Sequence, residues 1–237
     1  MKKYIEKLLD KEDLTIEESC DAMNEIMNGK VDNSNLAGFL IALKSKGEAP
    51  EEVAGFAMAM RDSCIKINFS DDNLIDVCGT GGDNSGSFNI STAVSFVAAG
   101  AGVKVAKHGN KSVSSKCGSA DVLQQLGINI NLPKEKAEEA LDKIGIAFLF
   151  APLYHPAMRH AVQVRKELRM KTVFNMLGPL TNPAGVKRQL IGTFNSVAAE
   201  TMAKAAMHLN IDKVCFVCCG DKYDEVYLGE PTSIFEF

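Results

Sequence analysis

The sequence lacks a long apolar segment that could cross or enter a membrane. Its most apolar run, residues 91–106, is interrupted by Gly100 and Gly102 and then by Lys104. It is therefore too short and too broken to span a bilayer. The N-terminal residues 1–14 carry charges throughout, in place of the unbroken apolar stretch of a signal peptide. We therefore expect a cytoplasmic protein.

The sequence also lacks a basic block. The 237 residues have a formal net charge of -4, with 46% apolar and 24% charged residues. This composition is that of an ordinary globular protein. A mildly acidic chain is a poor general binder of nucleic acid, because that affinity comes mostly from Lys and Arg on phosphates. A small anionic substrate is not excluded, since a few cations and backbone amides are enough to bind one.

A disulfide framework is missing as well. The seven cysteines are odd in number and show no regular spacing. Cys215, Cys218 and Cys219 lie together on a predicted buried strand. We interpret the cysteines as reduced core thiols of a cytosolic protein.

What the first 65 or so residues do contain is a series of helix signals. Thr15 followed by Glu18 fits a capping box that opens a helix ending near Gly29. Apolar residues then repeat at helical spacing until Gly47, and Pro50 stands where the next helix would begin. The pattern predicts an all-helical opening that buries its apolar stripes against another part of the molecule.

After residue 70, predicted strands and helices alternate. This alternation predicts a mainly parallel sheet with helices on its faces. The loops that follow the strands should then open on one edge of the sheet, where ligands bind in such folds. The predicted strands are 74–78, 103–106, 146–150, 213–218 and 227–237, and the predicted helices are 89–101, 121–126, 134–144, 156–168 and 197–209.

The first loop rich in chemistry is the glycine-rich segment 79–92. Glycines let a backbone approach a ligand closely, and their amides with a helix N-terminus bind phosphate-type anions. The segment has neither the G-K-[ST] of a Walker loop nor the spacing of a dinucleotide fingerprint. The alternative interpretation is a flexible turn between strand and helix.

A second polar loop, 107–115, follows the next predicted strand. It combines two lysines with an imidazole, an amide and three hydroxyl groups. A solvated basic loop is the alternative. Two such loops at one sheet edge favour a joint anion site. A third feature is the adjacent pair Asp224 and Glu225, which suits Mg²⁺ together with substrate phosphates. Two solvated acids in a hairpin turn are the alternative there.

Five segments together resemble the anthranilate phosphoribosyltransferase family, in order and at matching separations. They are residues 79–83, 89–92, 107–110, 114–122 and 175–183. Each segment is only moderately specific, but the combination is strong and the match covers almost the whole chain. The resemblance implies an α/β fold with a small all-α N-terminal domain and a mainly parallel central sheet flanked by helices.

The resemblance also implies how the chain is divided. Residues 1–68 would form a helical dimerisation domain, completed by 171–193, and residues 69–237 an α/β domain that binds the phosphoribosyl donor. Members of the family are usually homodimers. They continue well past this point. The tail of this sequence is a predicted apolar strand, and no residues follow that could cover it. We therefore expect the α/β domain to be incomplete at its C-terminus.

Site residues follow from the resemblance position by position. Donor binding is implied for Gly79, Thr80, Gly81, Gly82, Asp83, Ser87, Asn89, Ser91, Thr92, Lys107 and Ser119. Anthranilate binding is implied for Gly79, His108, Asn110, Arg165 and Pro179. Magnesium binding is implied for Ser91, Asp224 and Glu225, with two ions expected beside the donor. Lys111 stands where the family more often has Arg, so a bidentate contact is lost there.

The implied reaction transfers the phosphoribosyl group of 5-phosphoribosyl 1-pyrophosphate to the amine of anthranilate, in tryptophan biosynthesis. Bond breaking builds negative charge on pyrophosphate, which Mg²⁺, Lys107 and the loop amides would stabilise. Arg165 would attract the anthranilate carboxylate. No residue is expected to act as a covalent nucleophile.

Three rival readings remain from the sequence. A pyrimidine nucleoside phosphorylase would use phosphate as nucleophile and needs no acidic metal pair, so Asp224 and Glu225 argue against it. A non-catalytic relative that binds nucleic acid or a protein partner should show eroded donor loops and a basic surface, and this chain shows neither. The third is an inactive, truncated domain that still dimerises, which would give no heat of binding with donor and Mg²⁺.

Overall fold

The computed structural model describes residues 1–81, 86, 88–112 and 117–237. Its first elements are α1 (Lys2–Leu9), α2 (Ile16–Met27), α3 (Asn33–Lys46) and α4 (Pro50–Ser63). The predicted capping box opens α2, because the Glu18 amide donates to Thr15 Oγ1 at 3.2 Å and the Thr15 amide to Glu18 Oε2 at 2.9 Å. Gly47, at φ 95°, ends α3 as predicted.

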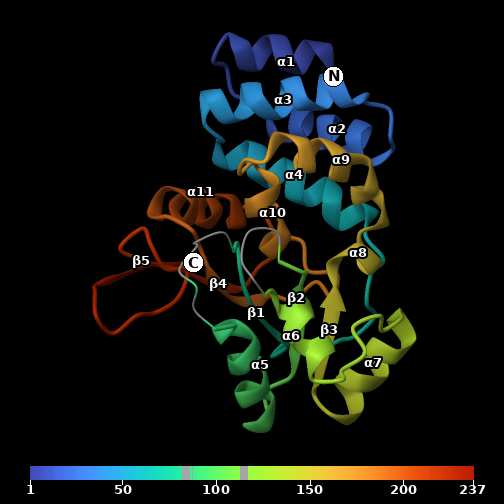
Figure 1. Cartoon of the computed structure of the whole chain (residues 1–237). Helices are drawn as coiled ribbons and strands as arrows, with labels where there is room; N and C mark the ends of the chain where they lie inside the picture. Colours follow the sequence, from blue (N-terminus) through green and yellow to red (C-terminus); the bar gives the residue numbers. More distant parts are fainter. Residues whose placement is uncertain (82–85, 87, 113–116) are drawn as a thin grey trace.

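These helices pack as two pairs, α1 with α3 and α2 with α4, and Phe39 meets Phe56 edge-to-face with ring centroids 5.9 Å apart. Two helices from far along the chain join them. Helix α9 (Arg159–Leu168) packs on α2 and α3, and α10 (Phe174–Leu180) packs on α4, as Figure 1 shows. The domain division at residue 68, with completion by 171–193, stays a prediction, since packing alone does not define an independent folding unit.

The rest of the chain forms a six-stranded sheet in the order β3-β2-β1-β4-β5-β6. Strands β1 to β5 pair in parallel, and β6 is antiparallel to β5. The predicted α/β class with a mainly parallel sheet is thereby confirmed. The strands are β1 (Ile75–Gly79), β2 (Val105–Gly109), β3 (Ile146–Phe150), β4 (Arg188–Gly192), β5 (Lys213–Cys219) and β6 (Thr232–Glu236).

Strand β4 lies in the middle of the sheet, although no strand is predicted from its sequence. Only Leu190 and Ile191 are large apolar residues in this five-residue strand. Ile191 is fully buried, but Leu190 on the opposite face is 38% exposed. A short strand with one open face has little local signal, so its pairing with β1 and β5 decides its structure.

The remaining helices cover parts of the sheet. They are α5 (Ile90–Gly100), α6 (Ser119–Gln125), α7 (Lys134–Lys143), α8 (Ala151–Tyr154), the 3₁₀ turn η1 (Pro156–Met158) and α11 (Ser196–Ala206). Helix α11 packs on β5 and also on α4 of the helical part. One apolar core therefore runs from Phe56 in α4 through Met202 in α11 to Phe216 in β5.

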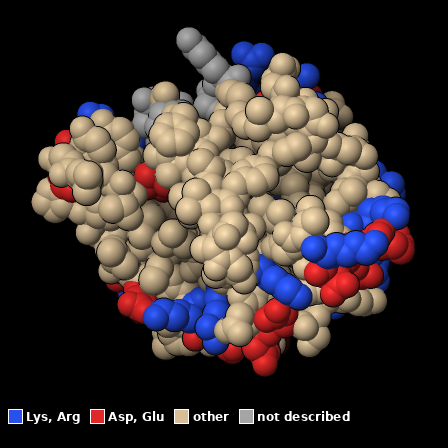
Figure 2. All heavy atoms as spheres, turned by 90° about the horizontal axis from the view of Figure 1, so that it is seen from below, with Lys and Arg blue, Asp and Glu red and all other residues tan. Residues whose placement is uncertain are grey.

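Helix α5 is oriented against the usual polarity of a surface helix. Its Thr92 and Ser95 are buried, whereas Val94, Phe96 and Val97 are exposed. Figure 2 views the end of the molecule where α5 lies, and charged side chains gather there near the rim rather than at the centre. The outer surface of this end is therefore largely uncharged.

The cysteines only partly match the interpretation as core thiols. Cys218 and Cys219 are buried, but Cys117 is exposed. Cys215 and Cys218 stand in C-x-x-C spacing, yet three residues apart on β5 they point to opposite faces of the sheet. None of the helices in the described ranges is long and apolar enough to span a membrane.

Candidate active site

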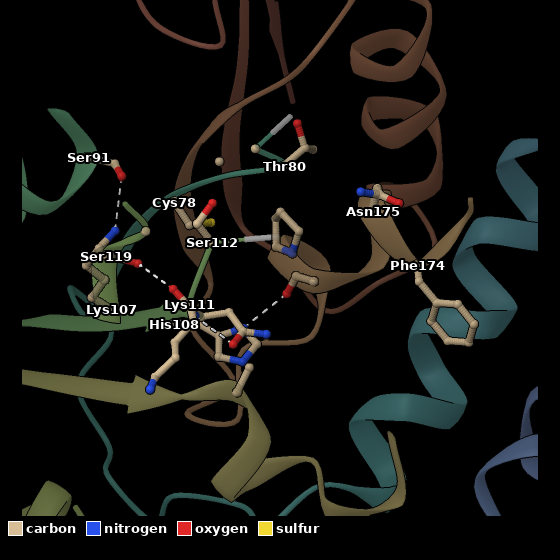
Figure 3. Close-up of a pocket in the computed structure, with 18 of the residues that line it drawn as sticks. Cys78, Thr80, Ser91, Lys107, His108, Lys111, Ser112, Ser119, Phe174 and Asn175 are labelled. Carbon is tan, nitrogen blue, oxygen red and sulfur yellow. Dashed lines mark hydrogen bonds between the residues drawn. The ribbon is translucent and has the colours of Figure 1, made fainter. Parts of the chain in front are cut away.

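A cavity of about 490 Å³ lies at the carboxyl ends of β1 and β2, below the helical part of the molecule. The two polar loops predicted to share a sheet edge both line it, and so do residues of α9, α10 and the segment after β5. Figure 3 shows Lys107, Ser91 and Ser119 on one side of this cavity and Phe174 with Asn175 on another.

The loop after β1 is held against β4. The Thr80 amide donates to the Gly192 carbonyl at 2.8 Å, and Thr80 Oγ1 accepts from the Phe194 amide at 3.0 Å. Gly79 and Gly81 line the cavity, and Gly81 has the positive φ of 63° that glycine permits. Three predicted donor ligands in this loop lie outside the described residues: Gly82, Asp83 and Ser87.

The start of α5 brings two of its predicted ligands to the cavity. Asn89 and Ser91 line it, and Asn89 Nδ2 donates to the Cys117 carbonyl at 3.3 Å. The other predicted ligand of this helix, Thr92, is buried and is not among the described residues that line the cavity. Its Oγ1 has no hydrogen-bond partner within the described part of the chain.

Lys107 is a buried cation at the floor of the cavity. Its Nζ donates to the Val77 carbonyl at 2.6 Å and to Ser91 Oγ at 3.2 Å. Burial lowers the pKa of Lys107, and the negative charge of Asp76 opposes that shift. A desolvated ammonium group beside a hydroxyl group is well suited to an anionic ligand.

Asp224 and Glu225 follow β5 and line the same cavity as Lys107 and Gly81. The segment that carries Asp224 can pack against the ends of β1 and β4 only because both strands end in glycine. A Cβ on Gly79 would lie 3.0 Å from Asp224 Oδ2, and one on Gly192 would overlap the Asp224 carbonyl. The acidic pair Asp224 and Glu225 thus lies at the same site as the two loops.

The acidic pair is not a complete metal site by itself. No group of three His, Cys, Asp or Glu side chains within the described ranges is placed to hold a metal ion. Asp224, Glu225 and Ser91 nevertheless present oxygen atoms around one cavity. Mg²⁺ prefers oxygen ligands and often takes the remaining ones from substrate phosphates and water. The residues present therefore fit a magnesium ion that arrives with a phosphorylated substrate.

His108 lies on the other side of β2 from Lys107. Its Nδ1 is 3.1 Å from the Gly178 carbonyl. Burial, with a smaller effect of His155, lowers the pKa of His108 to about 3, so the ring is neutral near pH 7. A neutral ring beside a carbonyl oxygen carries its proton on Nδ1. The buried Nε2, which has no partner among the described residues, is then an acceptor.

Arg165 reaches the cavity from α9. It is half-buried, and its Cζ is 5.1 Å from the centroid of the Phe174 ring. Burial lowers the pKa of Arg165, but an arginine stays charged at neutral pH. It forms no ion pair with a carboxylate in the described part of the chain. A partly desolvated guanidinium without an ion-pair partner in the described part of the chain can donate hydrogen bonds to a ligand carboxylate.

The other predicted residues also reach the cavity. Ser119 at the start of α6 lines it and donates through Oγ to the Asn110 carbonyl at 3.4 Å. Asn110 and Lys111 are exposed at the rim, and Pro179 in α10 forms part of the wall. The Pro179 carbonyl accepts from Gln189 Nε2 at 2.8 Å, which ties this wall to β4.

Some lining residues are not predicted from the sequence. His155, after α8, lies with its ring centroid 5.1 Å from that of His108, and burial lowers its pKa to about 4. Phe174 and Asn175 line the cavity from α10. His155 stands between the recognised motifs, so only the path of the chain reveals it. Asn175 opens the fifth motif and could have been named from its amide side chain.

A helical bundle joined to a mainly parallel α/β part, with a cavity between them, matches the architecture of a glycosyl transferase family. Residues 2–64 match the model of the glycosyl transferase family helical bundle domain, and residues 71–237 match that of the a/b domain. Relatives named anthranilate phosphoribosyltransferase are 46% to 48% identical to this chain over its whole length, so the chain belongs to that family.

Three relatives show how far the similarity extends. Over all of this chain and 70% of the relative's length, it is 46% identical to the anthranilate phosphoribosyltransferase of Persephonella marina. The solved enzyme of Thermus thermophilus is 41% identical, with a TM-score of 0.89 over 98% of this chain and 72% of that one. The enzyme of Saccharomyces cerevisiae, solved in complex with PRPP and Mg, is 28% identical, with a TM-score of 0.90 over 99% and 71%.

Proposed function

We propose that this chain transfers the phosphoribosyl group of 5-phosphoribosyl 1-pyrophosphate to the amine of anthranilate, with release of pyrophosphate, in tryptophan biosynthesis. The observation that carries the proposal is one cavity lined by Gly81, Lys107, Glu225 and Arg165. It offers cations and oxygen ligands to a metal-bound diphosphate at one side and a guanidinium to an aromatic acid at the other.

The donor would lie along the loop after β1 and the start of α5. Backbone amides near Gly79 and Gly81 would face its phosphates, because no Cβ blocks their approach. Lys107 would neutralise part of the charge that develops on the leaving pyrophosphate. Its burial makes that interaction stronger than it would be in water.

Asp224, Glu225 and Ser91 would hold magnesium beside the donor. When bound, Mg²⁺ supplies positive charge to the phosphate oxygens of the leaving group. We propose two ions, since the adjacent carboxylates come from the segment after β5 and the Ser91 hydroxyl comes from α5.

Anthranilate would bind with its carboxylate at Arg165 and its ring against Pro179. His108 and Asn110 would orient the amine towards C1 of the ribose, which converts binding energy into alignment. The neutral His108 fits a role of hydrogen bonding and orientation rather than of acid catalysis. The amine of anthranilate is itself neutral at pH 7, so no strong base and no covalent nucleophile is required.

The test is the magnesium dependence of transfer. Consumption of anthranilate, followed by its fluorescence, should require both the donor and Mg²⁺ and should stop when EDTA is added. The double variant D224N/E225Q should lose the reaction while keeping its fold by circular dichroism. Transfer that is unaffected by EDTA would refute the metal assignment.

A parallel assay addresses the rival activity. Phosphorolysis of a pyrimidine nucleoside by phosphate needs no acidic metal pair, so it should be absent here. Calorimetry with 5-phosphoribosyl 1-pyrophosphate and Mg²⁺ addresses the inactive alternative, because an inactive domain gives no heat of binding.

We also propose that the chain acts as a cytoplasmic homodimer that pairs through a helical domain of residues 1–68 and 171–193. Apolar side chains support this, since Leu9 and Ile41 on the outer helices are 64% and 47% exposed. Light scattering should give about twice the 25.6 kDa mass of one chain. A monomeric mass at micromolar concentration would refute the dimer. The incompleteness of the α/β part at its C-terminus stays a prediction.

A further inference from the structure

The hydrogen-bonded ladder between β1 and β2 stops before the cavity, although the two strands stay neighbours in the sheet. They are in register only at Ile75 and Val105, whereas β1 pairs with β4, and β2 with β3, along their whole lengths. We call this break in the ladder, which begins after Ile75 and Val105, the fork. Its two arms lead into the two loops that line the cavity.

The fork interrupts a regular parallel ladder. Where the two strands are in register, the Ile75 amide donates to the Lys104 carbonyl at 3.0 Å. In a continuing parallel ladder, the Val77 amide would donate to the Ala106 carbonyl, and the His108 amide to the Val77 carbonyl. Groups of this kind cannot stay buried without partners, so something else must satisfy them.

Side chains take the place of the missing strand partner. Three of the four backbone groups just named, the Ala106 carbonyl, the Val77 carbonyl and the His108 amide, have a side-chain partner at hydrogen-bond distance. The bonds are Asn182 Nδ2 to the Ala106 carbonyl at 2.8 Å, Lys107 Nζ to the Val77 carbonyl at 2.6 Å, and the His108 amide to Asp76 Oδ1 at 3.2 Å.

Asp76 and Asn182 also bind each other, with Asn182 Nδ2 donating to Asp76 Oδ2 at 2.8 Å. Both carboxylate oxygens of Asp76 are therefore occupied. Asn182 Oδ1 in turn accepts from the Ala184 amide at 2.9 Å, which anchors the segment after α10 to the fork. Both residues are buried, and neither is among the described residues that line the cavity.

This arrangement sets the spacing of the two sides of the site. The β1 arm carries Gly79 and Gly81, and the β2 arm carries Lys107 and His108. A closed ladder would replace the side-chain bonds of Asp76, Lys107 and Asn182 by direct bonds between the strands and would shift one arm relative to the other. The fork thus affects how the two sides of the cavity are placed.

We propose that Asp76 and Asn182 are positioning residues that hold the fork open and fix the donor side relative to the acceptor side. The proposal rests on the proposed function, because it assigns the two sides to two substrates. Neither residue touches a substrate, so loosening the fork should disturb alignment more than the binding of the donor alone. A misalignment of about 1 Å can cost about 100-fold in rate.

The experiment compares D76N and N182A with the wild type. Calorimetry with 5-phosphoribosyl 1-pyrophosphate and Mg²⁺ gives the number of donor sites and the donor Kd, and steady-state assays give kcat per donor site. We expect full stoichiometry, a donor Kd within about fivefold of the wild type and a kcat about 10- to 100-fold lower, as misalignment predicts.

The control is E52Q in the helical part. Glu52 is likewise fully buried and accepts from two backbone amides, those of Leu14 at 3.0 Å and Ala49 at 2.7 Å. It should lower the melting temperature and leave kcat per donor site unchanged. This separates a loss of alignment from a general loss of stability.

If the wild type is active and D76N and N182A keep its kcat per donor site, the fork proposal is wrong and the proposed function stands. An equal fall of kcat per donor site in E52Q has the same consequence. If D76N binds no donor, N182A decides by the same criterion, since it leaves the charge of Asp76 in place. A wild type that binds the donor but transfers nothing refutes the proposed function, and the fork proposal with it.

Discussion

Arg165 and His108 face the same cavity in opposite electrical states. Burial lowers the pKa of both, but the ordinary pKa of arginine lies far above neutrality, whereas that of histidine is 6.5. The arginine therefore keeps its charge and the imidazole does not. The cavity thus places a charged guanidinium and a neutral imidazole in its lining, an environment that would suit an aromatic carboxylate with a neutral amine.

The charge of Arg165 should be felt by anthranilate and not by the donor. We expect R165A to raise the KM for anthranilate by about 10- to 100-fold, since hydrogen bonds to charged groups contribute about 1.5 to 3 kcal/mol. The donor KM should change little. The anthranilate KM of R165K should lie between those of the wild type and R165A, because the charge stays and the bidentate contact of the guanidinium is lost. The control is R188A, an exposed position on β4. Equal changes in both KM values would count against the assignment.

His155 should make the protein sensitive to acid. Its pKa is about 4 in the folded protein against an ordinary 6.5, so the unfolded chain binds more protons between these values. The stability this represents is fully present above pH 6.5 and is lost as the pH falls towards 4. In H155Q the melting temperature should fall less steeply over this window than in the wild type. Parallel melting curves against pH would contradict the assigned pKa.

At the scale of elements, the ends of β1 and β4 are shaped for the segment that follows β5. Gly79 and Gly192 are register partners, and each faces Asp224. The acidic pair is thus positioned by the absence of two side chains as much as by any bond. The Thr80 amide, just after β1, also donates to the Gly192 carbonyl of β4, so the proposed metal and phosphate parts of the site would share one support.

A methyl group at Gly192 should displace that segment. We expect G192A to weaken magnesium-dependent donor binding at least tenfold, because the new Cβ would overlap the Asp224 carbonyl. The matched control is G100A in α5, where a Cβ meets nothing within 4 Å. Calorimetry with the donor and Mg²⁺ measures both. Unaltered donor affinity in G192A would show that the segment does not need this close approach.

At the scale of the whole molecule, the helical and α/β parts share one apolar core. Phe56 of α4 and Phe216 of β5 are both fully buried and belong to the same cluster. Helix α11 packs against both parts and connects them. Stability in either part therefore depends on contacts with the other, and the two should unfold together.

Calorimetric unfolding should show a single transition, and F56A and F216A should each lower it. The expected cost is about 3 to 5 kcal/mol for each, because both leave cavities in a packed core. F237A should have little effect, since Phe237 is 42% exposed. Two transitions, with each substitution moving only one, would show independent domains instead.

Local chemistry in the sequence determined much of this protein. Thr15 with Glu18, Gly47 and Pro50 mark helix boundaries through backbone bonds that form within a few residues. The glycine-rich loop follows a predicted strand, and Lys107 to Lys111 are predicted to follow the next one, so parallel geometry already places both segments at one edge, although β2 in fact extends to Gly109. These features need no knowledge of distant contacts.

Other features were decided only by the tertiary structure. Strand β4 is defined by its neighbours, since its five residues carry a weak pattern. Asp76 and Asn182 meet across 106 positions of sequence, and no local rule connects them. His155 becomes part of the site because the residue after α8 lies beside His108 of β2. In each case the deciding interaction joins segments that are distant in the chain, and its free energy exists only once the sheet has formed.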